Sequence, residues 1–120
     1  MAISDRKGKK YIEESNVEAS ANMTTDNGTI EVNATTIDDD IEEKISLIKM
    51  DIEGDEQKAL IGCTNHIKNE HPKLLISVYH NHEDLWKVPR MIDEMYPNYK
   101  FYLRYYGNNI FPTEIVLMTI

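Results

Sequence analysis

The stretch of sequence that decides the fold is Ile45-Ser-Leu-Ile-Lys-Met-Asp-Ile-Glu-Gly54-Asp-Glu-Gln-Lys-Ala-Leu60. An apolar run of strand length leads into an acidic turn that contains a glycine, and apolar residues then recur at helical spacing. In open α/β sheets, ligands bind beyond the carboxyl ends of the strands. Asp51 and Glu53 are therefore expected at a functional edge of a sheet.

The residues after this stretch predict a strand–helix–strand unit. A helix is expected over residues 55–70, closed by Pro72, because its apolar residues share one stripe: Leu60, Cys63 and Ile67. Residues 74–79 form a nearly unbroken apolar run, which is typical of a parallel strand covered on both faces. Two parallel strands joined by a right-handed helical crossover follow from this order.

The two ends of the chain predict mainly strands. Residues 9–15 and 29–37 suit short strands of a peripheral β arm spanning residues 1–37, and Asp38 to Asp40 suit the cap of a short helical turn. After a helix near residues 85–95, the runs 99–106 and 114–120 predict an antiparallel hairpin.

Composition limits the class of protein. A chain of 120 residues with 41% apolar and 28% charged residues has room for one domain. The net charge of −8 disfavours nucleic acid as a partner, because such binding depends on Lys and Arg. A single cysteine, Cys63, excludes an internal disulfide, and no apolar run reaches the length of a bilayer span. We therefore expect a cytoplasmic protein without a membrane partner.

A longer sequence pattern resembles one enzyme family. Residues 48–62 resemble the Ile-Lys-x-Asp-x-Glu-Gly-x-Glu-x-x-x-Leu-x-Gly signature of FkbM-type S-adenosylmethionine-dependent methyltransferases, and residues 32–39, 72–80 and 83–86 are similar to further family segments. Asp55 departs from the pattern, since the family usually has Ala there. The resemblance implies an α/β fold, namely residues 38–120 as the carboxyl half of a Rossmann-like methyltransferase sheet that ends in an antiparallel hairpin.

The resemblance also implies a cofactor and an acceptor. The donor would be S-adenosylmethionine, and the acceptor a small molecule such as a sugar or natural product that is methylated on a hydroxyl. A donor of this kind rests against a glycine-rich turn after a strand. The five glycines are scattered and form no such motif, so its cofactor-binding residues are unknown. We expect a truncated enzyme that is inactive alone and does not bind the donor tightly. Unless the amino-terminal arm covers its unpaired strand edge, we expect the chain to form a homodimer or strand-exchanged oligomer or to aggregate through that edge.

The candidate catalytic residues are Asp51, Glu53 and His80. The carboxylates would orient an acceptor hydroxyl or take its proton, and His80, at the end of the next strand, would act as a general base. Taken alone, Glu53 is as well explained as a helix cap and Asp51 as a partner of Lys49. Aromatic side chains suit an acceptor pocket, and the candidates are Trp86, Tyr102 and Tyr106.

Two other classes of function compete with methyl transfer. The first is a non-catalytic interaction module that completes a partner's sheet through an exposed strand edge. The second is a metal-dependent hydrolase that uses His80, His82 and Asp51. We expect no metal, because closely spaced ligands from one segment need further ligands elsewhere. His66 and His71 are expected to be solvated, and Cys63 to be buried and unreactive.

Overall fold

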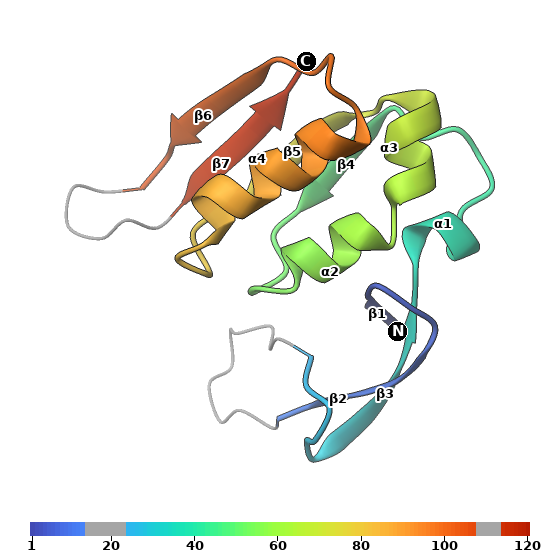
Figure 1. The fold of residues 1–120 in the computed structure, drawn as a ribbon. Coiled ribbons are helices and arrows are strands. Elements are labelled where there is room, and N and C mark those ends of the chain that lie inside the picture. Colours follow the sequence, from blue (N-terminus) through green and yellow to red (C-terminus); the bar gives the residue numbers. More distant parts are fainter. Residues whose placement is uncertain (14–23, 108–113) are drawn as a thin grey trace.

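The chain folds into two β-sheets and a layer of helices (Figure 1). The computed structural model describes residues 1–13, 24–107 and 114–120. In chain order the elements are β1 (Ala2–Ile3), β2 (Gly8–Ile12), β3 (Ile30–Thr35), α1 (Ile37–Asp40), β4 (Leu47–Met50), α2 (Glu56–Ile61), α3 (Thr64–Glu70), β5 (Lys73–Ser77), α4 (Asp84–Met95), β6 (Phe101–Tyr105) and β7 (Ile115–Thr119).

The larger sheet has the strand order β4-β5-β7-β6. β4 and β5 are parallel, with Ile48 opposite Leu74, whereas β7 runs antiparallel to both β5 and β6. The predicted parallel pair and the predicted carboxyl-terminal hairpin are therefore confirmed. Helices α2, α3 and α4 lie on one face of this sheet (Figure 1), and the core between them is formed by buried aliphatic side chains, among them Leu60, Ile67, Leu74, Ile76 and Ile92.

The helix predicted over residues 55–70 is wrong in one respect, because it is broken into α2 and α3 at Gly62. A Cβ atom at Gly62 would lie 2.1 Å from the backbone oxygen of Ser4, so the close approach of the amino-terminal segment requires glycine. The carbonyl of Gly62 accepts a hydrogen bond from the backbone N–H of Asp38 at 2.8 Å. The break is thus the point at which the preceding chain packs against the helices.

The three aspartates before Ile41 do not precede a helix as predicted; they lie within α1, which is capped by Thr36. The Thr36 Oγ1 atom accepts from the backbone N–H of Asp39 at 3.0 Å. The carboxylate of Asp38 instead accepts from the backbone N–H groups of Asn65 and His66, at 2.9 and 3.1 Å. Asp38 therefore accepts hydrogen bonds from two backbone N–H groups in the first turn of α3 that have no partner within the helix. It caps that helix from a distant part of the sequence.

The amino-terminal region forms a smaller sheet of order β1-β3-β2. β2 and β3 are an antiparallel pair and correspond to the two predicted strands, although residues 14–15 of the first prediction lie outside the described residues. β3 ends at Thr35 rather than Ile37, and the short β1, which pairs parallel to β3, was not predicted. The radius of gyration of 14.7 Å exceeds the value of about 13.6 Å typical of a compact chain of this length, as expected for an arm beside the main sheet.

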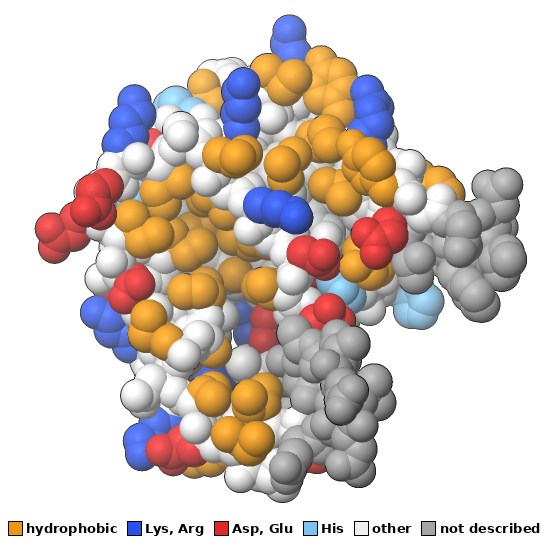
Figure 2. Space-filling model, turned by 180° about the vertical axis from the view of Figure 1, so that it is seen from behind, with side chains coloured by type: hydrophobic (Ala, Val, Ile, Leu, Met, Phe, Trp, Pro, Cys, Tyr) orange, Lys and Arg blue, Asp and Glu red, His pale blue; other side chains and the backbone are white. Residues whose placement is uncertain are grey.

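No helix of the described residues lies over one face of the larger sheet, whereas the apolar run of residues 74–79 predicted a strand covered on both faces. Along β4, Ile48 and Met50 are buried under the helices, whereas Leu47 and Lys49 on the other face are exposed. Leu75, Met118 and Tyr102 continue that outer face across the sheet. Figure 2 views the molecule from this side and shows apolar side chains interspersed with lysine and arginine. An antiparallel sheet tolerates one wet face, and the antiparallel strands here make this arrangement possible.

Two further observations concern edges and membranes. Within the described ranges, no strand pairs with the outer edge of β4, since the arm forms a sheet of its own. The longest helix of the described part, α4, has 12 residues, and none is long and apolar enough to cross a bilayer.

We predict that the outer face and free edge of β4 make the chain self-associate as a homodimer. Leu47 is 53% exposed on this strand, so Leu47→Lys should weaken the dimer more than about tenfold by placing a charge in the interface. Sedimentation equilibrium measures the dissociation constant. Ile61→Lys is the matched control, because Ile61 is 50% exposed on the helix α2 rather than on a strand of the sheet. Equal weakening by both variants, or a chain that stays monomeric, would contradict the prediction.

Candidate functional site

The turn after β4 presents two carboxylates at the edge of the sheet. Ile48 and Met50 anchor the strand in the core, and the chain then reverses into α2 through Glu53 and Gly54, which have φ angles of 60° and 109°. Such positive φ values favour glycine and explain Gly54 in the sequence. The side chains of Asp51 and Glu53 remain 41% and 39% exposed. They are accessible to a ligand.

His80 lies at the same edge, just after β5. Its Nε2 atom is 3.7 Å from Asp51 Oδ1 and 3.6 Å from Glu53 Oε2, and its side chain is 11% exposed. The structure thus brings the three predicted catalytic residues together. The cause is the parallel pairing of β4 and β5, which places both carboxyl ends side by side.

Glu56 is a member of this cluster that the sequence analysis missed. It lies in the first turn of α2 and is fully buried. One oxygen, Oε1, accepts from the backbone N–H of Ile52 at 3.0 Å and lies 3.0 Å from His80 Nδ1. The imidazole is poorly aligned with that oxygen, so Nδ1 makes no regular hydrogen bond, and Glu56 Oε2 has no partner among the described residues. The sequence signal for this role was a further acidic residue three positions after Glu53. An acidic residue there is equally well explained by its favourable interaction with the amino end of the helix dipole.

Tyr79, two residues after β5, also contacts the cluster. Its hydroxyl group donates a hydrogen bond to Asp51 Oδ1 at 3.2 Å, and its ring lies 4.1 Å from that of His80. Burial and the negative charge of Asp51 raise the pKa of Tyr79 to about 12. Tyr79 therefore keeps its proton near neutral pH and acts as a donor that orients Asp51.

A buried polar network holds the two turns of the site together. Asp84 is fully buried and accepts from the backbone N–H and the side-chain amide of Asn81, both at 3.2 Å, and from Gln57 at 2.7 Å. The Asn81 amide also donates to the Gly54 carbonyl at 3.1 Å. Since Asn81 follows β5 and Gly54 follows β4, this network fixes the spacing between the segments that carry His80 and Glu53.

A cavity of about 280 Å³ lies beside Asp51, between the amino-terminal arm and the end of β4. Its lining consists of Met1, Ala2, Ile3, Thr24, Asp51, Ile52 and Asp55. Asp55, the residue that departs from the family pattern, is buried and accepts hydrogen bonds from Thr24, another residue of the lining. Its Oδ2 atom accepts from the backbone N–H and the hydroxyl of Thr24, both at 2.7 Å, and Lys58 lies 2.7 Å from Oδ1. Asp55 therefore ties the arm to α2.

The three aromatic residues predicted to line an acceptor pocket do not line this cavity. Trp86 on α4 is 60% exposed, Tyr102 on the outer face of β6 is 38% exposed, and Tyr106 beyond β6 is 62% exposed. Arg104 lies 5.9 Å from the ring centre of Tyr102. Their role in acceptor binding stays a prediction.

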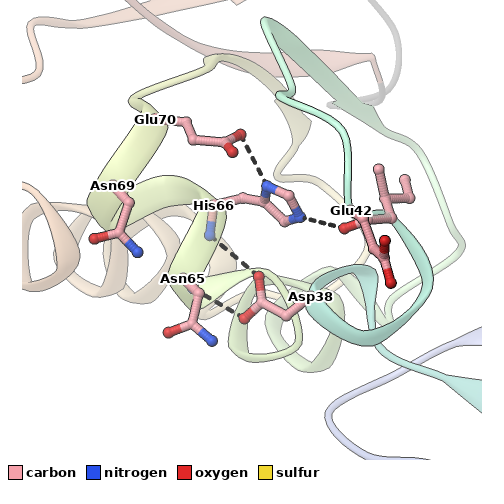
Figure 3. A pocket seen from close by; sticks show the side chains of 7 residues that line it. Asp38, Glu42, Asn65, His66, Asn69 and Glu70 are labelled. Carbon is pink, nitrogen blue, oxygen red and sulfur yellow. Dashed lines mark hydrogen bonds and ion pairs between the residues drawn. The ribbon is translucent and has the colours of Figure 1, made fainter.

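Another pocket, of about 240 Å³, is lined in part by His66 (Figure 3). The prediction of a solvated His66 is wrong, because the residue is only 8% exposed. Its Nδ1 and Nε2 atoms lie 2.8 Å from Glu70 Oε2 and 3.0 Å from the Ile41 carbonyl oxygen. Both ring nitrogens have partners, so His66 connects α3 to the chain before β4. Cys63 is fully buried as predicted, and burial raises the pKa of its thiol to about 12.

The fold and the site define an α/β protein with an acidic, histidine-containing cluster beyond two parallel strands. A family profile described as "Methyltransferase FkbM domain" matches residues 3–110. The crystal structure of the methyltransferase FkbM from Methylobacillus flagellatus KT is similar, with 34% identity and a TM-score of 0.70; the match covers 75% of this chain and 24% of that chain. No match was found among curated proteins. The chain belongs to the FkbM methyltransferase family, and it spans about a quarter of the length of the crystallised relative.

We predict that Asp55→Ala releases the arm from α2. The variant removes the acceptor for both donors of Thr24 and the ion pair with Lys58, and hydrogen bonds to a charged group contribute roughly 1.5–3 kcal/mol. We expect the free energy of unfolding to fall by about 2 kcal/mol. The amide of Thr24 should also exchange with deuterium faster.

Chemical denaturation and amide exchange followed by NMR measure both effects. Asp39→Ala is the control, since Asp39 is half-exposed and its contact with Lys7 is 3.8 Å long. If Asp55→Ala changed stability no more than Asp39→Ala, the tie between arm and helix would have no energetic importance.

We predict that the His66 and Glu70 pair stabilises the fold over a limited pH range. Burial disfavours the charged imidazole, but the hydrogen bonds with Glu70 and the Ile41 carbonyl outweigh it and raise the pKa of His66 above 6.5. The backbone N–H of Ile45, followed by His66, lowers the pKa of Glu70 below 4.5. The contribution of His66 is complete below pH 6.5 and is lost as the pH rises through its raised pKa. That of Glu70 is present above pH 4.5 and is lost as the pH falls through its lowered pKa.

The melting temperature of the natural chain minus that of His66→Gln should therefore be largest between about pH 4.5 and about pH 6.5 and should shrink at higher pH. Differential scanning calorimetry at several pH values measures the difference. His82→Gln, at an exposed position, controls for loss of an imidazole. A difference independent of pH would show that the ring acts only through packing.

Proposed function

We propose that this chain provides the acceptor side of an S-adenosylmethionine-dependent O-methyltransferase with a Rossmann-like sheet. The observation that carries the proposal is the meeting of Asp51, Glu53 and His80 beyond β4 and β5, with the Asp51 carboxylate also lining a cavity. Membership of the FkbM methyltransferase family supports the reaction class. Ligands of open α/β sheets bind at this end of the strands.

The residues of the site suit the handling of an acceptor hydroxyl. The cavity of about 280 Å³ has room for part of a small molecule, and Asp51 would accept a hydrogen bond from its hydroxyl group. Imidazole and carboxylate are the side-chain types that accept protons near neutral pH, and both lie within 4 Å of each other here. As the acceptor oxygen becomes methylated, His80 or Glu53 would take its proton.

The donor does not fit the residues described here. Gly54 lies in a turn after a strand, but that turn is occupied by the carboxylates of the site, and no Gly-x-Gly cradle precedes a helix in the sequence. Residues that hold S-adenosylmethionine are therefore not assigned. We expect the 120-residue chain alone to bind the donor weakly and to be inactive.

The rival functions differ in their support. An interaction module is favoured by the unpaired edge of β4 in the described part of the chain, and the dimerisation test above addresses it. A hydrolase built on His80, His82 and Asp51 is not supported. His82 is exposed, and the group of close metal-ligating side chains found among the described residues contains Glu56 in its place.

A chimaera tests the proposal. In the Methylobacillus flagellatus relative, the matching quarter of the chain is replaced by this sequence, and transfer of the labelled methyl group of S-adenosylmethionine to a panel of methyl glycosides and phenols is measured. We expect transfer to at least one member. His80→Gln and Glu53→Gln, separately, should lower kcat by up to about 10²–10⁴ for the residue that takes the proton.

His82→Gln is the matched control, since it removes an exposed imidazole two residues from His80. Donor binding by calorimetry shows that each chimaera is folded. A chimaera that binds the donor but methylates no panel member, or that keeps full kcat in both His80→Gln and Glu53→Gln, would refute the assignment.

A further inference from the structure

Two buried polar atoms of the site lack hydrogen-bond partners within the described ranges. They are Glu56 Oε2 and His80 Nδ1. Glu56 is fully buried, and a buried carboxylate oxygen without a partner is costly. Such groups in native proteins usually contact a water molecule or an ion. The site therefore has an unmet requirement for a donor or a cation.

The surrounding geometry favours a cation. Asp51, Glu56 and His80 each offer one ligand atom, and these atoms all lie within 4.8 Å of one another. They come from three segments, namely the end of β4, the first turn of α2 and the end of β5. Ligands that share one ion at about 2.1 Å in octahedral geometry lie about 3.0 Å apart when adjacent and about 4.2 Å apart when opposite. Small side-chain rotations would bring the three groups to that spacing.

The net negative charge of the site also favours a cation. Three carboxylates, those of Asp51, Glu53 and Glu56, lie within 4 Å of the His80 ring nitrogens. In the described part of the chain, no lysine or arginine forms an ion pair with them, and the nearby Lys58 pairs with Asp55. A divalent cation would offset this concentration of negative charge.

We propose that Asp51, Glu56 and His80 bind one divalent transition-metal cation, with Glu53 beside it. The imidazole suits transition metals and the two carboxylates suit hard cations such as Mn²⁺. This mixed set therefore fits a transition metal better than Mg²⁺ or Ca²⁺, which bind oxygen ligands. Supporting contacts are in place. The N–H of Ile52 holds Glu56 Oε1 and leaves Oε2 free, and the hydroxyl of Tyr79 orients Asp51.

The metal site goes beyond the proposed methyl transfer and does not depend on it. If both proposals hold, the cation occupies His80, and Glu53 is the group left to take the proton of an acceptor hydroxyl. The test below contains no methyl donor. Failure of metal binding and failure of methyl transfer are therefore distinguishable.

Mn²⁺ binding to the 120-residue chain, freed of metal with a chelator, provides the test. The electron paramagnetic resonance signal of free Mn²⁺ decreases on binding, and we expect one site. Asp51→Asn, Glu56→Gln and His80→Gln should each weaken binding by about tenfold or more, and Tyr79→Phe by less. His82→Gln and Asp93→Asn, at exposed positions, are the controls and should bind as the natural chain does.

A second measurement needs no variant and therefore does not depend on their folding. In NMR spectra of the natural chain, Mn²⁺ should broaden the amide signals of Gly54 and Asn81, which flank the cluster, before those of Asn65 and His66 at the other pocket. Absence of binding at millimolar Mn²⁺ would overturn the proposal. So would broadening centred on Asp38 to Asp40, or unchanged affinity in all three ligand variants.

Discussion

The parallel pairing of β4 and β5 is the constraint on which the site depends. Because both strands point the same way, their carboxyl ends meet at one edge, and the residues that follow them face each other although they are nearly thirty positions apart in sequence. Antiparallel pairing would place Asp51 and His80 at opposite ends of the sheet. The crossover through α2 and α3 makes the parallel arrangement possible, and Glu56 on α2 is brought under the same edge.

Hydrogen bonds between residues distant in sequence hold several segments of this fold in place. Asp38 caps α3, Asp55 holds Thr24, and Asp84 joins the two turns of the site. Each is a carboxylate that accepts at least two hydrogen bonds, and each connects segments that are not neighbours in the chain. Among the described residues, the apolar core lies in the layer between the sheet and the helices. These carboxylates therefore fix geometry that packing alone would leave loose.

The sequence predicted those features that depend on local pattern. The parallel pair, the hairpin and the position of Asp51, Glu53 and His80 follow from apolar runs, turn residues and the rule that strand ends carry ligands. Three features depended on distant residues and were not predicted. Gly62 breaks the helix because Ser4 packs against it, Glu56 is buried because His80 covers it, and His66 is buried because the Ile41 carbonyl and Glu70 lie beside it. The contacts of Gly62 and His66 leave no signal in the neighbouring sequence, and the acidic residue at position 56 suited the helix dipole equally well.

Glu56 shows why the two edges of the molecule have different properties. At the edge formed by the strand ends, Glu56 is a buried carboxylate at a place where an apolar side chain would pack at lower cost. Its Oε2 atom, which has no partner among the described residues, supports the proposed role as a metal ligand. At the side of β4, by contrast, Leu47 is exposed and no strand of the described residues pairs with the edge, which supports the proposed self-association. At the first edge the proposed cation would be bound by charge, whereas at the second edge the proposed association would depend on apolar contact. The proposed ligand site and the proposed association surface therefore lie on separate parts of the same four-stranded sheet.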